Sequence, residues 1–556
     1  MSDLLLEIGC ENLPPACIKP AFDQLAKLAA GRLAEHRLPY EEIYTTGGPR
    51  RLVLIVRGLA ATQTSKTETV TGPPASRAFD GNGDPTPAAL GFARSHGVAV
   101  KDLRCIPTDR GEYVGVTRRL RSQRASVLLR EILPGLISDL KFPKVMRWES
   151  TGMSFARPIR WIVALLEEKV VRFKIAGVVA GNVTYTIPWI RRDRIKVRGA
   201  DHYLSQLSKA GVVLDHDERF HKIQRLAQQA AARAGLTLVE DRSLCGELTF
   251  MLEDPRHLLG AFDEKYLKLP PEVVTTAMKG HQRYLALRGK RNRLVAKFIT
   301  FTEGKVGSPA EVRKGNEKVL KARLEDALFY WQEDVKTGIQ GLADKLRSIV
   351  FVEGLGTLAD KAARLETIGL HLGKSGALEV PEATIVRAAR LAKADLASEM
   401  IKDGKEFTLL QGIIGSHYAR EAGEPGEIVT AFRQHYRPRN PSDPLPATPL
   451  GALLGIADRI DTIAGCFLAG LTPSGSQDPY ALRRLANGLI RILEDKPEIS
   501  IQSLLEVTIA AFENQGLNRG ADGEVTERLA EFFQNRTEAF LKEQGIAYDV
   551  VGAVSA

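Results

Sequence analysis

The pattern of the chain changes near Lys336, and this change constrains the fold more than any other feature. Before it, apolar runs such as Leu4–Ile8 alternate with helical stretches such as Ile18–His36, which is typical of mixed α/β modules. Beyond it, one helical pattern follows another as far as Ser500–Gln544. Because 556 residues are too many for one core, we predict an α+β multidomain protein with mixed α/β modules in front and an all-α region behind.

Composition suggests where the modules meet. Gln63–Pro87 is rich in Thr, Gly and Pro and is predicted to be a loop that opens a second module, and Pro438–Pro449 carries five prolines, which predicts an extended connector. We expect an α/β unit at 1–62, a mixed α/β region at 63–200, a second mixed region with a basic segment and a long helix at 201–336, a helical domain at 337–520 and a C-terminal helical segment at 521–556.

Charge and cysteine content limit the function classes. The chain has 77 Lys+Arg and 67 Asp+Glu, a net charge of +10, so any surface for a polyanion must be local. The five cysteines are scattered without a CxxC pair, which indicates reduced thiols and disfavours structural zinc. We find no signal peptide and no apolar run near the roughly 20 residues that span a bilayer. The sequence predicts a cytoplasmic protein without a membrane segment.

The strongest local charge feature begins at Ala277. From Ala277 to Leu294 there are six Lys and Arg residues, including Lys279 and Arg283, and no acid. Because clustered charge of one sign repels itself, such a segment indicates a polyanionic partner.

A helix is predicted directly after this segment. Ser308-Pro309-Ala310-Glu311 has the residues of a helix start. A helical period then places Leu320, Leu324, Ala327 and Trp331 on one buried face, and the aromatic run Phe329-Tyr330-Trp331 is expected to be buried near the helix end. Lys314, Lys318 and Lys321 lie together on a flank that can follow a phosphate backbone. The alternative is an ordinary solvated face with snorkelling lysines.

A second motif, Leu453–Asp461, ends an apolar helical run with Asp458 and Asp461. This resembles the last metal ligand of HD-type phosphohydrolases, which also need histidines and a His-Asp pair to hold a divalent ion. The corresponding upstream position reads Lys393-Ala394-Asp395, with no adjacent histidine, and only His371 offers a distant candidate. We interpret this as an HD-like helical fold without hydrolase chemistry and without a metal site.

Two arginines, Arg483 and Arg484, are expected in the first turn of a helix after a Ser-Gly-rich loop. Positive charge there opposes the helix dipole, so either a bound anion or a salt bridge to Asp458 or Asp461 is expected. No phosphate-binding loop, GxSxG elbow or HExxH motif occurs in the chain. We therefore predict no catalytic residue and no resident cofactor on this chain.

The motifs resemble, in order, those of the β subunit of bacterial heterotetrameric glycyl-tRNA synthetase. The matching stretches are Leu4–Pro15, Gly47–Leu54, Phe142–Trp148, Phe155–Leu165, Ala277–Tyr284, Gly315–Asp334, Leu391–Met400, Leu410–Ala419, Ile456–Gly465 and Asp478–Arg484. The resemblance implies a tRNA-binding accessory subunit with a B3/B4-like domain at 63–200 and an HD-like domain at 337–520. It implies an α2β2 heterotetramer in which the α subunit, a class II synthetase core, binds ATP and Mg²⁺ and attaches glycine to tRNA(Gly).

The resemblance also directs the choice of RNA-binding residues. Lys and Arg in the matching motifs supply the charge and donors that phosphate contacts need. The predicted contacts are Lys279, Arg283, Lys318, Arg323, Arg483 and Arg484. The family also carries a C-terminal anticodon-binding domain, which this sequence is expected to lack. An HD-type metal-dependent phosphohydrolase and a stand-alone RNA-binding protein stay as alternatives.

Overall fold

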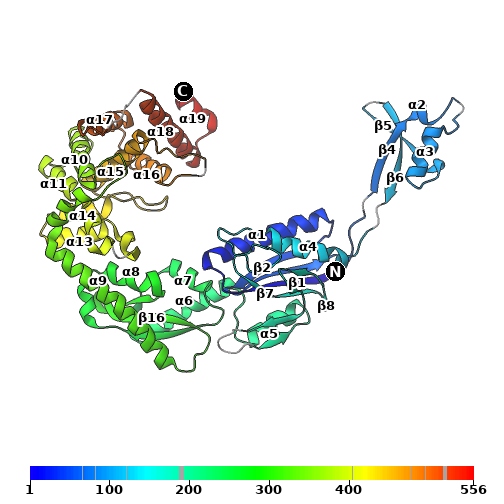
Figure 1. Ribbon diagram of the computed structural model, residues 1–556, viewed down its shortest axis with the longest axis horizontal. Helices are drawn as coiled ribbons and strands as arrows, with labels where there is room; N and C mark the ends of the chain where they lie inside the picture. Colours follow the sequence, from blue (N-terminus) through cyan, green and yellow to red (C-terminus); the bar gives the residue numbers. More distant parts are fainter. Residues whose placement is uncertain are drawn as a thin grey trace. The chain divides into compact units, whose positions relative to one another are not determined.

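A computed structural model describes residues 1–65, 67–81, 83–109, 111–119, 122–186, 193–402, 405–475, 477–494, 496–517 and 523–555. The chain divides into two compact units. The first contains residues 1–258 and 299–309, and the second contains residues 259–298 and 310–556. Strands and helices mix in the first unit, whereas helices dominate the second (Figure 1). The predicted mixture of α/β modules in front and helices behind is confirmed at this level.

The first unit is built on a five-stranded antiparallel sheet of order β2-β3-β1-β7-β8. Its strands are β1 (Ser2–Cys10), β2 (Glu42–Gly48), β3 (Arg51–Leu59), β7 (Ile159–Leu166) and β8 (Lys169–Val170). Strand β1 thus lies between β3 and the distant β7. The hairpin between β2 and β3 turns at Pro49-Arg50. Just before the turn, at Gly47, φ is 146° and a Cβ atom would lie 2.1 Å from the Arg51 carbonyl oxygen. Only glycine fits that position.

Both faces of this sheet are buried, because successive side chains of a strand point to opposite sides. Leu4, Leu6 and Ile8 pack with α1 (Pro15–Glu35) and α4 (Ala125–Asp139). Leu5 packs on the opposite face with α5 (Ala200–Lys209). Figure 1 shows α1 and α4 on one side of the sheet and α5 on the other. Burial on both sides explains why β1 reads as a nearly continuous apolar run.

One charged cluster is buried at this sheet. Arg51 Nη1 donates to Glu7 Oε1 at 2.9 Å, and Arg51 Nε donates to Glu253 Oε1 at 2.9 Å. The same guanidinium donates to Thr184 Oγ1, to the Tyr185 carbonyl and to the second Glu253 oxygen. All five guanidinium N–H groups therefore have acceptors. The Arg51 side chain connects β3 to β1 and to the loop at Glu253.

A small module follows the first three strands. It contains β4 (Thr67–Pro74), α2 (Ala75–Ala78), α3 (Pro87–Ser95), β5 (Arg104–Thr108) and β6 (Gly111–Arg119), with sheet order β4-β6-β5. The predicted loop at Gln63–Pro87 is therefore wrong over most of its length. Thr67–Thr71 pairs in register with Gly115–Arg119, and β-branched residues suit that pairing although their Thr-rich composition indicated a turn.

The first unit continues with shorter elements. These are β9 (Lys174–Ile175), β10 (Val178–Val179), β11 (Val183–Tyr185), β12 (Arg194–Lys196), α6 (His216–Arg233), β13 (Thr237–Leu238), α7 (Arg242–Thr249) and β14 (Pro255–Ala261), whose end lies in the second unit. Asp215 caps the first turn of α6 by accepting from the Glu218 N–H at 2.7 Å.

The second unit starts with α8 (Pro271–Gln282), β15 (Leu285–Arg288) and the first part of β16 (Leu294–Glu303). Helix α9 (Pro309–Lys345) begins where the Ser308-Pro309 motif predicts. It continues beyond the aromatic run, with non-helical backbone at Gly338 (φ 72°, ψ 157°). The expected burial of the run is wrong for Phe329, which is 58% exposed, and Tyr330 and Trp331 are only half-buried. Because α9 continues past the run to Lys345, these side chains lie within the helix and not at its end.

The rest of the second unit is helical. Its main helices are α10 (Leu358–Lys374), α11 (Glu382–Leu391), α13 (Ile413–Glu421), α14 (Gly426–Gln434), α15 (Pro449–Leu468), α16 (Leu482–Leu493), α17 (Ile501–Asn514), α18 (Gly523–Glu543) and α19 (Tyr548–Ser555). Thr357 caps α10, since Asp360 N–H donates to Thr357 Oγ1 and Thr357 N–H donates back to Asp360. Helix α15 packs against α10, α14, α16 and α17, and is buried over most of its length. None of the described helices is both long and apolar enough to cross a membrane.

Candidate nucleic-acid interface

The basic segment starts at the carboxyl end of α8. Lys279 is exposed there, and Arg283 ends the helix in the left-handed region with φ 55°. The Arg283 N–H donates to the Lys279 carbonyl at 3.3 Å, and its Nη1 donates to the Gly280 carbonyl at 2.6 Å. The guanidinium thus lies at the negative end of the helix dipole, where a cation is favoured. Both predicted contacts, Lys279 and Arg283, therefore lie at one end of one helix.

Tyr284 connects this helix end to α9. Its ring stacks on Phe298 of β16, with 4.4 Å between centroids. Its hydroxyl donates to Asn316 Oδ1 at 2.6 Å, and Asn316 Nδ2 donates to the Val312 carbonyl at 2.8 Å within α9. Burial raises the pKa of Tyr284 to about 12, so the hydroxyl keeps its proton at neutral pH. The motifs Ala277–Tyr284 and Gly315–Asp334 therefore meet where the Tyr284 hydroxyl contacts Asn316.

Replacing Tyr284 with Phe removes that donor while keeping the stacked ring. We expect the second unit to lose about 1 kcal/mol of stability, the usual contribution of one such hydrogen bond. Thermal melting of the full chain measures the loss. An unchanged melting temperature together with unchanged RNA affinity would show that the hydroxyl does not couple the two motifs.

The flank of α9 presents three lysines. Lys314, Lys318 and Lys321 are exposed, whereas Leu320 and Leu324 are fully buried, as the helical period predicts. Arg323 lies apart from this row. At about 100° per residue it is rotated roughly 140° from Lys318 around the helix axis, and it is half-buried. Lys318 can therefore contact the same partner as Lys314 and Lys321, while Arg323 points to another side of α9.

Glu272 attaches α8 to the helices behind it. Its carboxylate accepts from His417 Nε2 of α13 at 3.1 Å and pairs with Arg433 of α14. The His417 hydrogen bond is the main cause that lowers the pKa of Glu272 to about 2, and Arg433 adds to it against the effect of burial. This contact fixes the helix that carries Lys279 on the helical part of the same unit.

This carboxylate gives a pH-dependent contribution to stability. Because the folded-state pKa is lowered from 4.5 to about 2, the contribution is complete above pH 4.5 and is lost as the pH falls toward 2. Glu272→Gln should therefore lower the melting temperature at pH 7, and its difference from the native chain should shrink progressively below pH 4.5. Melting curves across this range measure it. A constant difference at every pH would exclude the carboxylate as the cause.

Arg483 and Arg484 lie in the first turn of α16, as predicted. Asp478 offsets their conflict with the helix dipole: its Oδ1 accepts from the Leu482 N–H at 2.8 Å and its Oδ2 from the Arg483 N–H at 3.1 Å. Arg484 is exposed and Arg483 is half-buried. Neither arginine forms an ion pair with any residue that the structure describes, so the expected salt bridge to Asp458 or Asp461 is wrong. Those two carboxylates pair with other cations.

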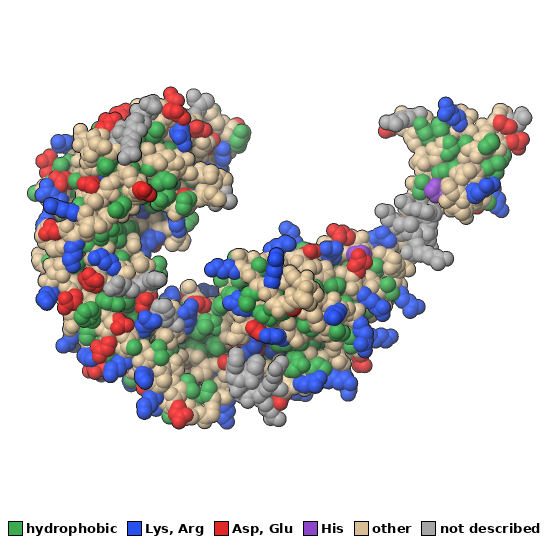
Figure 2. Space-filling model, in the orientation of Figure 1, with side chains coloured by type: hydrophobic (Ala, Val, Ile, Leu, Met, Phe, Trp, Pro, Cys, Tyr) green, Lys and Arg blue, Asp and Glu red, His purple; other side chains and the backbone are tan. Residues whose placement is uncertain are grey.

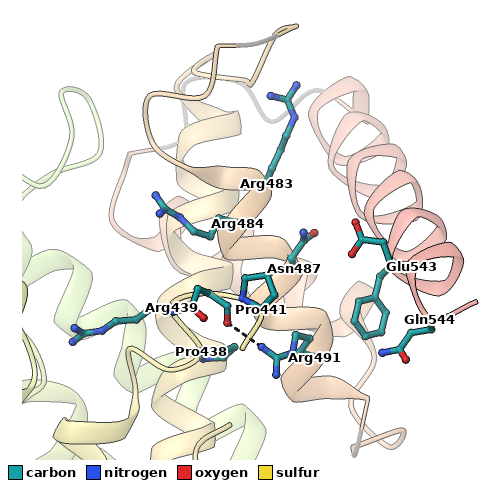
Figure 3. A pocket seen from close by; sticks show the side chains of 12 residues that line it. Pro438, Arg439, Pro441, Arg483, Arg484, Asn487, Arg491, Glu543 and Gln544 are labelled. Atoms are coloured by element: carbon teal, nitrogen blue, oxygen red, sulfur yellow. Dashed lines mark hydrogen bonds between the residues drawn. The ribbon is translucent and has the colours of Figure 1, made fainter. Parts of the chain in front are cut away.

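A pocket of about 520 Å³ lies beside these arginines. Figure 3 shows that Arg483 and Arg484 leave α16 in different directions, and that Asn487 of α16 and Glu543 of α18 lie on facing walls. Arg491 donates to the Asn440 carbonyl at 3.1 Å and so holds the proline-rich connector in place. The two guanidiniums do not converge, which means that one phosphate cannot bind both. On the face drawn in Figure 2, Lys and Arg side chains are interspersed with acidic ones among the described residues.

Asp458 and Asp461 belong to a buried charge centre. Lys361 of α10 donates to Asp461 Oδ2 at 2.7 Å, and Lys393 donates to Asp458 Oδ2 at 2.6 Å. Arg364 Nε donates to Asp461 Oδ1 at 2.5 Å. Burial raises the pKa of Asp458, but Lys393 and Lys361 outweigh it and hold that pKa well below its usual range. The Asp458 carboxylate is therefore ionised, and lysine and arginine side chains pair with both carboxylates.

The histidine beside this centre is His435, which the sequence did not indicate. His371 instead contacts Ser503 Oγ at 2.9 Å, and Asp395 accepts from the Gly412 N–H at 2.6 Å. Neither His371 nor Asp395 contacts Asp458. His435 Nε2 lies 3.3 Å from Lys393 Nζ. No local signal could reveal this, because 42 residues separate the two positions. In the part of the chain that the structure describes, no three His, Cys, Asp or Glu residues are grouped to hold a metal ion.

Comparison with known proteins places the chain in a family. The family profile described as "Glycyl-tRNA synthetase beta subunit" matches residues 4–556. The glycine–tRNA ligase beta subunit of Moorella thermoacetica is 40% identical over 554 residues, which cover 99% of this chain and 79% of the relative. That of Syntrophotalea carbinolica is 39% identical over 554 residues, which cover 100% of this chain and 80% of the relative. The chain therefore belongs to the glycyl-tRNA synthetase beta subunit family.

Proposed function

We propose that this chain is the tRNA-binding accessory subunit of a glycine–tRNA ligase, and that the aminoacylation site lies in a partner α subunit that binds ATP and Mg²⁺. The observation that carries the proposal is the basic segment from α8 to α9 in a member of this family. The hydrogen bond between Tyr284 and Asn316 joins α8 to α9 and so holds the cations of both helices in fixed positions. Such a rigid basic surface suits a folded polyanion such as tRNA(Gly).

The six candidate residues fall into three groups. Lys279, Arg283 and the Lys318 row belong to one group that Tyr284 brings together. Arg323 faces away from Lys318, so its phosphate contact would lie on a different stretch of RNA. The third group is Arg483 and Arg484, which diverge on α16 (Figure 3) and would contact separate phosphates.

The same proposal includes the finer organisation of the protein. Residues 63–200 would correspond to a B3/B4-like domain and residues 337–520 to an HD-like domain. The assembly would be an α2β2 heterotetramer in the cytoplasm. An HD-type phosphohydrolase is the weaker candidate, because lysine and arginine already neutralise Asp458 and Asp461. A stand-alone RNA-binding role would not explain why the chain belongs to a family of synthetase subunits.

Replacing Lys279 and Arg283 together with Ala tests the RNA contact. We expect tRNA(Gly) affinity to fall on the order of tenfold and the slope of log affinity against log salt to decrease by about 2, since two phosphate contacts are lost. Filter binding at several salt concentrations measures both values.

A matched control is the pair Lys374→Ala and Arg420→Ala, which removes two exposed cations from the same unit outside these motifs. The control should retain native affinity and slope. If the Lys279 and Arg283 variant behaves like the control, these residues do not contact RNA.

A further inference from the structure

His435 has the hydrogen bonding of a metal-binding histidine. Its Nδ1 lies 2.9 Å from the Phe432 carbonyl oxygen, an acceptor only, so Nδ1 carries the proton. The other nitrogen, Nε2, therefore presents a lone pair, and it faces Lys393 Nζ at 3.3 Å. In metal sites the same arrangement, with one ring N–H on a backbone carbonyl, directs the second nitrogen at the metal. Here an ammonium group occupies that direction.

The carboxylates complete the arrangement. Asp458 Oδ2 accepts from the Lys393 ammonium at 2.6 Å, and Asp458 Oδ1 lies 3.0 Å from Lys361 Nζ. Lys361 also reaches Asp461 Oδ2 at 2.7 Å and Thr462 Oγ1 at 2.8 Å. Both lysine side chains are only 3% exposed. Lys393 thus lies between an imidazole lone pair and a carboxylate, which is the position that a divalent ion takes between such ligands.

A divalent ion does not fit this centre as it stands. The lone pairs that would bind it are directed to ammonium groups, and buried ammonium charge at this distance repels a cation strongly. We infer that Lys393 and Lys361 act as fixed internal cations in place of a divalent metal, supplying two positive charges to the His435, Asp458 and Asp461 side chains. The helical part is then independent of metal, and removal of both lysines opens a latent metal site.

Access for an ion exists on one side. A pocket of about 410 Å³ is lined by Lys361, Lys393, Gln411, Tyr436 and Asp458. Replacing both Lys361 and Lys393 with Ala would leave His435 Nε2 and Asp458 facing space that joins this pocket, where water completes a coordination shell. This inference depends on the buried charge centre alone, so it stands or falls independently of the proposed RNA contacts.

Cobalt titration of the full chain tests the inference, because protein-bound Co²⁺ has visible absorption. The native protein, treated with EDTA and dialysed, should bind no Co²⁺ at this centre, and neither EDTA nor Co²⁺ should shift its melting temperature. The variant that carries both Lys361→Ala and Lys393→Ala should bind one Co²⁺ per chain, and its melting temperature should rise by several degrees when Co²⁺ is added. Adding His435→Ala removes the nitrogen ligand, and this triple variant should show neither effect.

The test still decides if the variant does not fold without metal. If the Lys361→Ala, Lys393→Ala variant is unfolded without metal, refolding with Co²⁺ should recover it, while the triple variant should stay unfolded. Equal responses of the double and triple variants to Co²⁺ would overturn the inference. So would an EDTA-removable ion held by the native His435 and Asp458 side chains.

Discussion

Arg51→Met should destabilise the first unit by about 3–5 kcal/mol, the cost of leaving a buried ion pair without one partner. The methionine fills similar space but leaves two carboxylates, Glu7 and Glu253, that are 0% and 1% exposed. Glu7 on β1 would then lie without the guanidinium, and Glu253 would keep its pair with Arg50. Since the domain itself is only marginally stable, we expect a large drop in melting temperature and loss of soluble protein.

Arg51→Lys separates the effect of charge from that of geometry. Lysine keeps the charge but offers three donors from one atom, so it cannot reproduce the five hydrogen bonds of Arg51. It should recover only part of the lost stability. Arg172→Met is the matched control, because Arg172 is exposed in the same unit and its loss should stay within about 0.5 kcal/mol. A native melting temperature for Arg51→Met would refute the role of this cluster.

Asp461→Asn should have a comparable effect in the second unit. The substitution keeps the shape of the side chain but removes the negative charge that pairs with the buried Lys361 and Arg364. We expect this to cost about 3–5 kcal/mol of stability. Asp326→Asn, an exposed change in α9, is the control and should be neutral. Thermal melting compares the two, and equal melting temperatures would contradict the account of the charge centre.

Local signals predicted most of the secondary structure. The cap residues Thr357 and Asp360 fix the start of α10 through neighbours three residues apart, and the Ser308-Pro309 motif fixes the start of α9. The helical period also assigned Leu320 and Leu324 to the buried face correctly. In contrast, β4 was predicted as a loop. Its pairing with β6 depends on residues about 45 positions away, and the Gly and Pro around it outweighed its β-branched residues in the prediction.

The site was predicted less completely, for a related reason. Basic residues in one stretch, such as Lys279 and Arg283, are visible in the sequence, but Tyr284 and Asn316 meet only in the fold, 32 residues apart. The charge centre brings Lys361 within reach of Asp461, 100 residues away, while His435 approaches Lys393. Spacing therefore indicated that Asp458 and Asp461 matter but could not identify their partners.

Glycine charging of tRNA(Gly) tests the central claim most directly. The assay compares the purified chain, the α subunit from the same source, and their mixture, each with ATP, Mg²⁺ and glycine. We predict that the chain alone forms no glycyl-tRNA and that charging by the mixture far exceeds charging by α alone. Charging by this chain alone, or a mixture no faster than α, would contradict its role as the tRNA-binding accessory subunit.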